Sequence, residues 1–310
     1  MKFLQVKGLS ATYATSKGKI HALQDITFSL DKGESLGIAG ESACGKSTLG
    51  LSIIRMLQGG NVDSGIIHLD GESLLDIDEK TFDKKYRWKN ISMIFQGAMS
   101  SLDPVFTIKD QFKEILKQHN FEGDYNKCMA DSMMSVGLHQ DTLQRYPHEL
   151  SGGMKQRVIT AMALLLKPSF VIADEPTTAL DVLIQAQVIN LLKKLKGEGM
   201  SFMLITHDLA ILSEISDKIG IMYGGQMVEF GSSFEIYKNP KHPYTQGLLE
   251  SIPTLYGPKP KYIKGIPPSL ISPGTACRFI DRCPHAMDKC KKDPPNFETD
   301  SGYVKCWLYE

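Results

Sequence analysis

The stretch SLGIAGESACGKSTLG, residues 35–50, decides the fold class. Its apolar start predicts a short buried strand ending in glycine, and the residues from 46 to 57 have the spacing of a helix. Between them, residues 40–47 fit the pattern G-x-x-x-x-G-K-[ST]. A glycine-rich turn between a strand and a helix directs backbone N–H groups at one point, which suits a phosphate group. A glycine-rich turn with an incidental lysine is the alternative.

This phosphate loop predicts a site for a nucleotide and Mg²⁺. Lys46 would add a point charge for the phosphates, and Ser47 would offer its hydroxyl to the metal. Cys44 adjoins a helix N-terminus and Lys46, both of which lower a thiol pKa, although an inert packing role is equally open. The expected nucleotide-binding residues of the loop are Gly40, Glu41, Ser42, Ala43, Cys44, Gly45, Lys46, Ser47 and Thr48.

Strands and helices alternate through most of the chain, which predicts an α/β fold with a parallel core. The expected strands cover residues 3–13, 22–30, 35–40, 90–95, 169–174, 200–206 and 218–223. The expected helices cover residues 46–57, 108–119, 126–138, 153–166, 182–196 and 209–215. The helix-rich block predicts an inserted helical subdomain at about 98–166. After residue 236 the chain is rich in proline and glycine, and it predicts an appendage with little regular structure.

Two further segments carry chemistry. The apolar strand FVIADE, residues 170–175, ends in two carboxylates. Asp174 is placed to hold Mg²⁺, and Glu175 can polarise an attacking water as a general base, although an acidic pair in solvent is common. The segment LSGGMKQ, residues 150–156, has a serine that can cap a helix and two glycines that let the backbone approach an anion.

LSGGMKQ resembles the signature motif of ABC-type ATPases, and other landmarks of that family follow in order over residues 1–235. The resemblance implies a P-loop (RecA-like) core with an antiparallel β subdomain. It assigns Gln96 to the Q-loop, residues 179–181 with Asp181 to the D-loop, and His207 to the switch histidine. The resemblance also implies that the ring of Tyr13 stacks on the adenine ring of ATP. The implied catalytic residues are Glu175, His207 and Gln96, and the implied Mg²⁺ ligands are Ser47, Gln96 and Asp174.

In this family two subunits enclose ATP between them, and the signature motif of one covers the γ-phosphate held by the other. The residues implied to act in this way are Leu150, Ser151, Gly152, Gly153 and Gln156. One copy of each motif implies a dimer with a paralogous ATPase subunit or with itself. The chain departs from the family pattern at two places. Ala43 stands where the phosphate loop usually has glycine, and a positive φ there would add about 1 kcal/mol of strain. Gly97-Ala98 follows Gln96, where ATPases of the importer branch often have an acidic residue and proline.

The tail narrows the resemblance to ATPases of dipeptide, oligopeptide and nickel importers. The phrases that carry it are HPYT at 242–245, PPSL at 267–270, CRF at 277–279 and RCP at 282–284. Two transmembrane permease subunits and, indirectly, an extracellular solute-binding protein are the implied partners. Peptide is the first expected solute; nickel or another metal chelate, or sugar, is the alternative. A soluble non-transport ABC ATPase and an iron–sulfur redox or metal sensor are alternatives of another class.

Four cysteines lie in the last 34 residues: Cys277, Cys283, Cys290 and Cys306. Five, six and fifteen residues separate them, with no C-x₂₋₄-C pair of the kind zinc sites use. Wide spacing suits a larger cubane, and some members of the importer branch bind a 4Fe–4S cluster with matching cysteines. We therefore expect a 4Fe–4S cluster, with zinc or free thiols as alternatives. The domains expected are a nucleotide-binding domain at 1–235 and this extension at 236–310.

Bulk properties fit this interpretation. Lysine plus arginine equals aspartate plus glutamate at 35 each, which gives no support to a nucleic-acid partner. The N-terminus lacks an apolar signal region, and no run reaches the roughly 18 apolar residues that cross a bilayer. We expect an intracellular chain held peripherally at the cytoplasmic face of the membrane by its partners.

Overall fold

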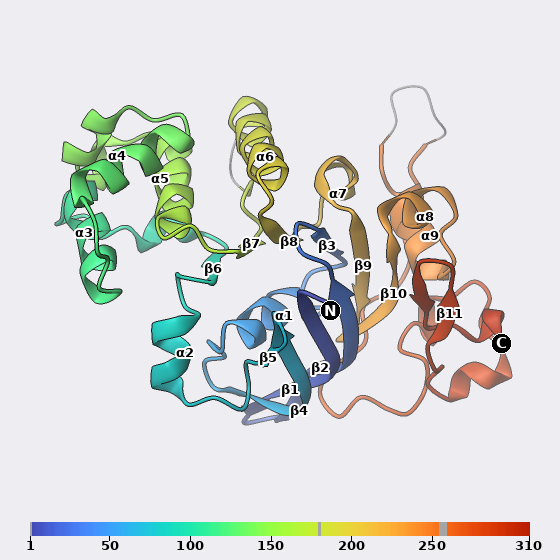
Figure 1. Ribbon diagram of the computed structural model, residues 1–310. Helices are drawn as coiled ribbons and strands as arrows, with labels where there is room; N and C mark the ends of the chain where they lie inside the picture. The colour runs from blue at the N-terminus through green and yellow to red at the C-terminus, as the bar shows by residue number, and fades with distance from the viewer. Residues whose placement is uncertain (1, 179–180, 254–258) are drawn as a thin grey trace. The chain divides into compact units, whose positions relative to one another are not determined.

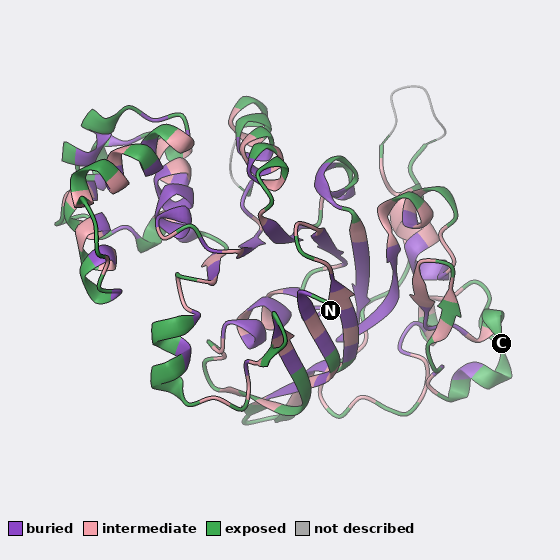
Figure 2. Cartoon of the chain, in the orientation of Figure 1, coloured by how far each residue is buried: buried purple, intermediate pink, exposed green. Residues whose placement is uncertain are grey.

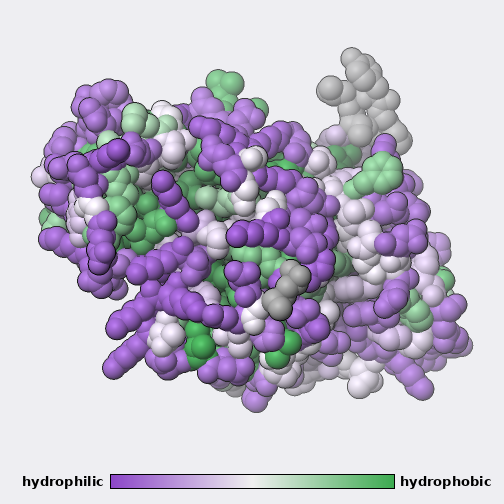
Figure 3. All heavy atoms as spheres, in the orientation of Figure 1, coloured by the Kyte–Doolittle hydropathy of each residue, from purple (hydrophilic) through white to green (hydrophobic). Residues whose placement is uncertain are grey.

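The computed structural model describes residues 2–178, 181–253 and 259–310 (Figure 1). Ala179 and Leu180 of the expected D-loop lie outside these residues. The chain forms two compact units, Met1–Asp76 with Leu204–Glu310, and Ile77–Met203. Among the described residues, no helix combines the length and apolar character needed to cross a bilayer. Hydrophilic residues predominate on the face drawn in Figure 3.

The first unit begins with an antiparallel sheet in the order β2-β1-β4-β5. Its strands are β1 (Leu4–Thr15), β2 (Gly18–Leu30), β4 (Gly60–Leu69) and β5 (Glu72–Ser73). Strands β1 and β2 form a longer hairpin than the sequence predicts, because backbone pairing continues through polar residues to Thr15 and Gly18. The expected antiparallel β subdomain is confirmed, although β4 and β5 give no periodic apolar signal and were not predicted.

A second sheet in this unit carries the phosphate loop. Strand β3 (Ser35–Ala39) is fully buried and pairs in parallel with β9 (Lys218–Tyr223), which pairs antiparallel with β10 (Gln226–Ser232). Helix α1 (Lys46–Ile53) follows the loop and ends four residues earlier than expected, since Arg55 adopts a left-handed φ of 57°. Figure 2 shows β9 and β10 buried along nearly their whole length. The remaining helices of the unit are α7 (Leu209–Ile215), α8 (Ser233–Lys238) and α9 (Pro243–Glu250).

The C-terminal extension has more regular structure than its composition predicts. Strands β11 (Phe297–Thr299) and β12 (Gly302–Val304) form a hairpin, and β12 pairs with β10. The buried carboxylate of Glu229 in β10 accepts hydrogen bonds from the backbone N–H groups of Lys241 and His242, at 2.8 and 3.0 Å. The extension therefore continues the sheet of its unit, and the expectation of an appendage with little regular structure is wrong for these strands.

The second unit combines parallel strands with helices. Strand β6 (Ile91–Ile94) pairs in parallel with β7 (Phe170–Asp174), and β8 (Ser201–Ile205) crosses the boundary between the units. Ser132 in α4 donates to the carbonyl of Ala161 in α5 at 2.8 Å, which joins these helices in the helical block. The helices of the unit are α2 (Glu79–Lys85), α3 (Ile108–Gln118), α4 (Tyr125–Ser135), α5 (Gly152–Leu164) and α6 (Val182–Gly197).

The junction of β10 and β12 gives a test of how firmly the extension is attached. A Cβ at Gly302 would lie 2.0 Å from the backbone oxygen of Phe230, so Gly302→Ala must push the two strands apart. We expect this variant to lose about 1–3 kcal/mol of unfolding free energy, measured by urea unfolding. Gly274→Ala is the matched control, because its Cβ would meet nothing within 4 Å. Equal stability of the two variants would contradict the pairing.

Candidate functional site

The phosphate loop of the first unit is held by close backbone contacts. A Cβ at Gly40 would lie 2.1 Å from the carbonyl oxygen of Met222, and one at Gly45 would lie 2.3 Å from that of Ala22. Both glycines have positive φ, 150° and 102°, so only glycine satisfies the space and the conformation at these positions. Ala43 has a φ of 60°, so the strain expected for an alanine there is present.

Lys46 lies folded over this loop. Its ammonium donates to the carbonyl oxygens of Gly40 and Glu41 at 2.7 and 2.8 Å, and the side chain is buried. Gly45 occupies the N-cap position of α1 without a side-chain cap, so the first N–H groups of the helix are left for an anion. Ser47 and Thr48 are half-buried at the start of the helix. These residues can surround a polyphosphate with N–H groups and one positive charge.

Tyr13 lies beside the loop helix, as the nucleotide assignment requires. Its hydroxyl donates to Oγ1 of Thr48 at 3.5 Å, and its ring is so close to Gly60 that a Cβ there would lie 2.7 Å away. The half-buried ring is a candidate surface for stacking on a base.

Cys44 is not the activated thiol that the sequence led us to expect. It is 4% exposed, and burial raises its pKa above the usual value despite the Lys46 ammonium 3.8 Å from the sulfur. The expectation of a lowered pKa is wrong because burial in an apolar surrounding outweighs the positive neighbour. This environment favours the inert packing role, which the sequence had left open as the alternative for Cys44.

His207 lies in the turn between β8 and α7 and is exposed. The next residue, Asp208, caps α7 by accepting from the backbone N–H of Ala210 at 2.9 Å. The cap fixes where the helix begins and therefore where the preceding histidine stands.

In the second unit, Gln96 and Glu175 meet although they are 79 positions apart. The amide of Gln96 donates to Oε2 of Glu175 at 3.1 Å, and Thr178, which sequence reasoning missed, donates to the same oxygen at 2.8 Å. Glu175 has a φ of 48°, an uncommon conformation for a residue other than glycine. Asp174, at the end of β7, is 3% exposed.

The signature segment is exposed where its residues would meet a partner. Ser151 caps α5 by accepting from the backbone N–H of Met154 at 3.3 Å, and Ser151 and Gly152 are exposed. Gly153 is half-buried, and a Cβ there would lie 2.9 Å from Ile184. Leu150 and Gln156 are buried, so they support the segment from within.

Asp181 and Gly97 occupy local backbone positions that explain their residue types. The side chain of Asp181 caps α6 by accepting from the backbone N–H of Ile184 at 3.0 Å. Gly97 has a φ of 68° ahead of a short 3-10 turn, a conformation that glycine adopts without strain.

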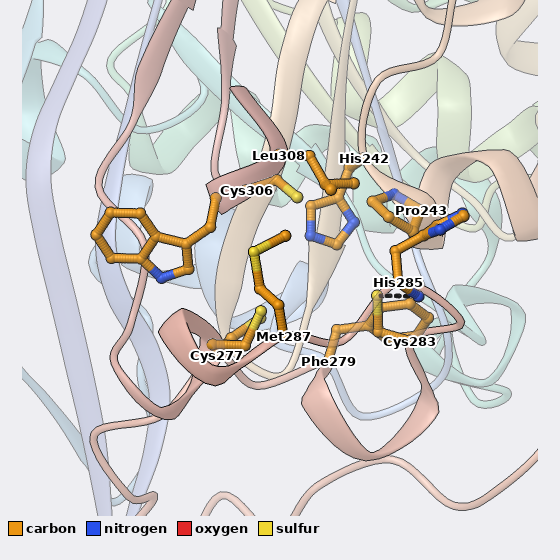
Figure 4. A pocket seen from close by; sticks show the side chains of 11 residues that line it. His242, Pro243, Cys277, Phe279, Cys283, His285, Met287, Cys306 and Leu308 are labelled. Carbon is orange, nitrogen blue, oxygen red and sulfur yellow. Dashed lines mark hydrogen bonds between the residues drawn. The ribbon is translucent and has the colours of Figure 1, made fainter. Parts of the chain in front are cut away.

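The four C-terminal cysteines line one pocket in the extension (Figure 4). Cys277 donates its backbone N–H to the carbonyl of Cys290 at 2.9 Å, and Cys283 accepts the N–H of His285 at 3.4 Å. Among the described residues none of the four forms a disulfide bond, and burial raises the pKa of the Cys277 thiol to about 12. The rest of the lining is formed by His242, Pro243, Phe279, His285, Met287, Trp307 and Leu308. Within the described ranges, no three His, Cys, Asp or Glu side chains converge as ligands of one metal ion.

Comparison with known proteins decides the family. A model described as ABC transporter matches residues 23–178, and one described as oligopeptide/dipeptide transporter, C-terminal region, matches residues 228–290. The chain belongs to the ABC transporter family. It is an ABC-type ATPase subunit, and the fold, ATP and Mg²⁺ expected from its motifs agree with this family.

Relatives match this ABC ATPase over nearly its whole length. The dipeptide transport ATP-binding protein DppD of Caldanaerobacter subterraneus subsp. tengcongensis is 40% identical, covering 99% of this chain and 97% of the relative. The oligopeptide transport ATP-binding protein OppD of Escherichia coli is 40% identical, covering 97% and 91%. A solved dimeric ATP-binding cassette in a post-hydrolysis state, bound to ADP and Pi, is 26% identical with a TM-score of 0.67, covering 74% and 98%.

The burial of Cys44 predicts slow alkylation. The thiolate is the reactive form, so a raised pKa lowers the alkylation rate at pH 7 to 8. The rate should increase with pH until the pH exceeds the raised pKa. We expect iodoacetamide to label Cys44 much more slowly in the folded chain than in urea, as quantified by mass spectrometry of its peptide. The Cys44→Ser variant identifies that peptide. Rapid labelling at pH 7 that Mg-ATP prevents would show an activated thiol instead.

Proposed function

We propose that this chain hydrolyses ATP to drive uptake of dipeptides or oligopeptides by a membrane importer. The observation that carries the proposal is the full-length similarity, 40% identity, to ATP-binding proteins named for dipeptide and oligopeptide transport. The match of the C-terminal region to that transporter class supports it. We divide the chain into a nucleotide-binding domain at 1–235, with a helical subdomain at about 98–166, and an extension at 236–310.

In this proposal the phosphate loop binds the nucleotide and the carboxylates act on water. The loop N–H groups and Lys46 hold the β- and γ-phosphates, which requires the Lys46 ammonium to exchange its loop carbonyls for phosphate oxygens. Ser47, Gln96 and Asp174 would hold Mg²⁺, which would supply positive charge to offset the charge that develops on the phosphates. Glu175 accepts a proton from the attacking water, and His207 helps to orient that water.

The hydrogen bonds to Glu175 bear on how the base is controlled. Two donors, Gln96 and Thr178, converge on Oε2, and they fix the carboxylate while stabilising its charged form. Gln96 therefore joins the base to the segment that follows β6, which in this family faces the membrane partner. A change at that segment would alter the hydrogen bond to the base and, with it, the rate of hydrolysis.

The assembly proposed is a dimer of this chain with a paralogous ATPase subunit or itself, bound to two permease subunits at the cytoplasmic face of the membrane. Exposure of Ser151 and Gly152 supports action on the nucleotide of the other subunit. An extracellular solute-binding protein is an indirect partner, because it would deliver the solute to the permease subunits rather than bind this chain. Copurification with two membrane subunits, and uptake of labelled dipeptides by the reconstituted assembly, test this. Uptake of nickel chelates or sugars alone would replace the peptide assignment with one of its alternatives.

Glu175→Gln tests the catalytic base. The amide keeps the size of the side chain but cannot accept the proton, so we expect turnover to fall by roughly 10²–10⁴-fold. The affinity for Mg-ATP should be retained, and ATP should hold the variant as a dimer. Steady-state phosphate release and size-exclusion chromatography with ATP measure these effects. Glu198→Gln, on the exposed C-terminal end of α6, is the control expected to hydrolyse normally. A Glu175→Gln chain with normal turnover would remove Glu175 from this role.

We further propose that the four-cysteine pocket holds a 4Fe–4S cluster. Four cysteines from separated positions line one pocket, together with His242, His285 and several apolar side chains. The spacing of the four cysteines, with no C-x₂₋₄-C pair among them, favours a cluster over a single zinc ion. When bound, the cluster would cross-link segments that are 29 residues apart from Cys277 to Cys306 and so stabilise the extension.

Anaerobic purification tests the cluster. We expect a brown protein with about four irons per chain, and Cys283→Ser should lose the colour and most of the iron because one ligand is removed. Iron and sulfide analysis and the visible spectrum measure this. Cys128→Ser is the matched control, since Cys128 lies in α4 and outside the pocket lining. A colourless protein with stoichiometric zinc would replace the cluster with the alternative metal.

A further inference from the structure

Two arginines of the extension lie at the short 3-10 turn Ile280–Arg282: Arg278 precedes it by two residues, and Arg282 is its last residue. Each follows or precedes a pocket cysteine directly in sequence: Arg278 follows Cys277, and Arg282 precedes Cys283. Phe279 and both cysteines line the pocket, whereas neither arginine is among its lining residues. Both arginines reach instead toward the phosphate loop of the same unit.

Arg282 forms a bidentate ion pair with the loop residue Glu41. Its Nη1 and Nη2 donate to Oε2 and Oε1 of Glu41 at 2.8 and 2.9 Å, and the arginine side chain is 5% exposed. The same guanidinium donates to the Tyr223 hydroxyl at 3.2 Å and to the backbone oxygens of Ile263 and Lys264. With these acceptors in place the guanidinium has one orientation, and it imposes that orientation on Glu41.

Glu41 is also fixed through its backbone. Its N–H donates to the hydroxyl of Tyr244 in α9 at 2.9 Å, and its carbonyl accepts from Lys46 at 2.8 Å. The ring of Tyr244 packs on Tyr223 with centroids 4.5 Å apart, and Phe279 contacts both rings at 5.4 and 5.2 Å. One aromatic cluster therefore joins the pocket wall to the first residue after Gly40.

Arg278 supports the middle of the same loop. It is 8% exposed and donates to the backbone oxygen of Gly224 and to Oε1 of Gln24. Gly224 and Gly225 form the turn between β9 and β10, and the N–H of Gly225 donates to the carbonyl of Cys44 at 3.0 Å. The loop is thus held at Glu41 by one arginine and at Cys44, through this turn, by the other.

We propose that Arg278 and Arg282 are positioning residues through which the C-terminal extension sets the affinity of the phosphate loop for ATP. Glu41 places a carboxylate in a loop whose ligand is a polyanion, and like charges repel. Arg282 neutralises that carboxylate and holds it in the ion pair. The inference rests on the proposed ATP site but not on which metal the cysteine pocket holds.

The charge argument makes a prediction that a purely structural role does not. Arg282→Gln leaves the Glu41 carboxylate uncompensated beside the phosphates, so the Kd for Mg-ATP should rise by roughly 5- to 100-fold. Adding Glu41→Gln removes the repelling charge, so the double variant should regain most of the lost affinity. Arg282→Lys keeps the charge but loses the bidentate geometry, so its Kd for Mg-ATP should lie between those of the wild type and Arg282→Gln.

The experiment is a titration of the full chain with a fluorescent ATP analogue and Mg²⁺, with melting temperatures measured in parallel. Lys291→Gln is the matched control: it breaks an ion pair with Asp288 in the same extension, 2.9 Å long and exposed on both sides. We expect its Kd to equal that of the wild type. If the wild type itself fails to bind, the proposed function is wrong; if it binds and Arg282→Gln binds equally well, this inference is wrong.

Linkage gives a reciprocal measurement. If the extension favours ATP binding, ATP must stabilise the extension to the same degree. The amides of Ile280 and Arg282, which donate to Cys277 and Phe279 at 3.1 and 3.0 Å, report on the turn. Their hydrogen exchange should slow with Mg-ATP in the wild type and much less in Arg282→Gln. Exchange unaffected by Mg-ATP in the wild type, or a double variant no better than Arg282→Gln, would overturn the proposal.

Discussion

The close approach of backbone to backbone around the phosphate loop is the constraint on which the first unit depends. Gly40 and Gly45 lie against carbonyl oxygens of Met222 and Ala22 at distances that no side chain could share. The loop is therefore packed between the end of β9 and β2. The positive φ of Ala43 shows that the loop geometry is maintained even where it strains a residue.

Local signals in the sequence predicted what depends on local chemistry. Apolar runs identified β3 and β7, and helical spacing identified α5 and α6, because these elements bury continuous apolar faces. Motif spacing identified the loop, the carboxylates that end an apolar strand identified Glu175, and the family resemblance added Gln96. The side chains of Gln96 and Glu175 meet in the structure. Strands β4 and β12 escaped prediction because backbone pairing with a neighbour, rather than an apolar pattern, holds them.

What the sequence could not supply is the surroundings of each candidate residue. Cys44 has a helix N-terminus and a lysine beside it in sequence, yet its burial decides its pKa, and burial comes from residues far along the chain. Thr178 and Tyr244 were missed for the same reason: a hydroxyl donor or acceptor has no motif, and only the fold brings it to Glu175 or Glu41.

The extension links folding to nucleotide binding through directional contacts with the rest of its unit. Its polar attachments are the strand pairing of β12 with β10, the buried Glu229 carboxylate, the ion pair of Arg282 with Glu41 of the phosphate loop, and the hydrogen bond of Arg278 to the turn between β9 and β10. Each attachment is polar and directional, so it is satisfied in one geometry and lost in others. An extension stabilised in this way holds the loop in one geometry as well. Whatever stabilises the four-cysteine pocket then acts on the same equilibrium as the nucleotide.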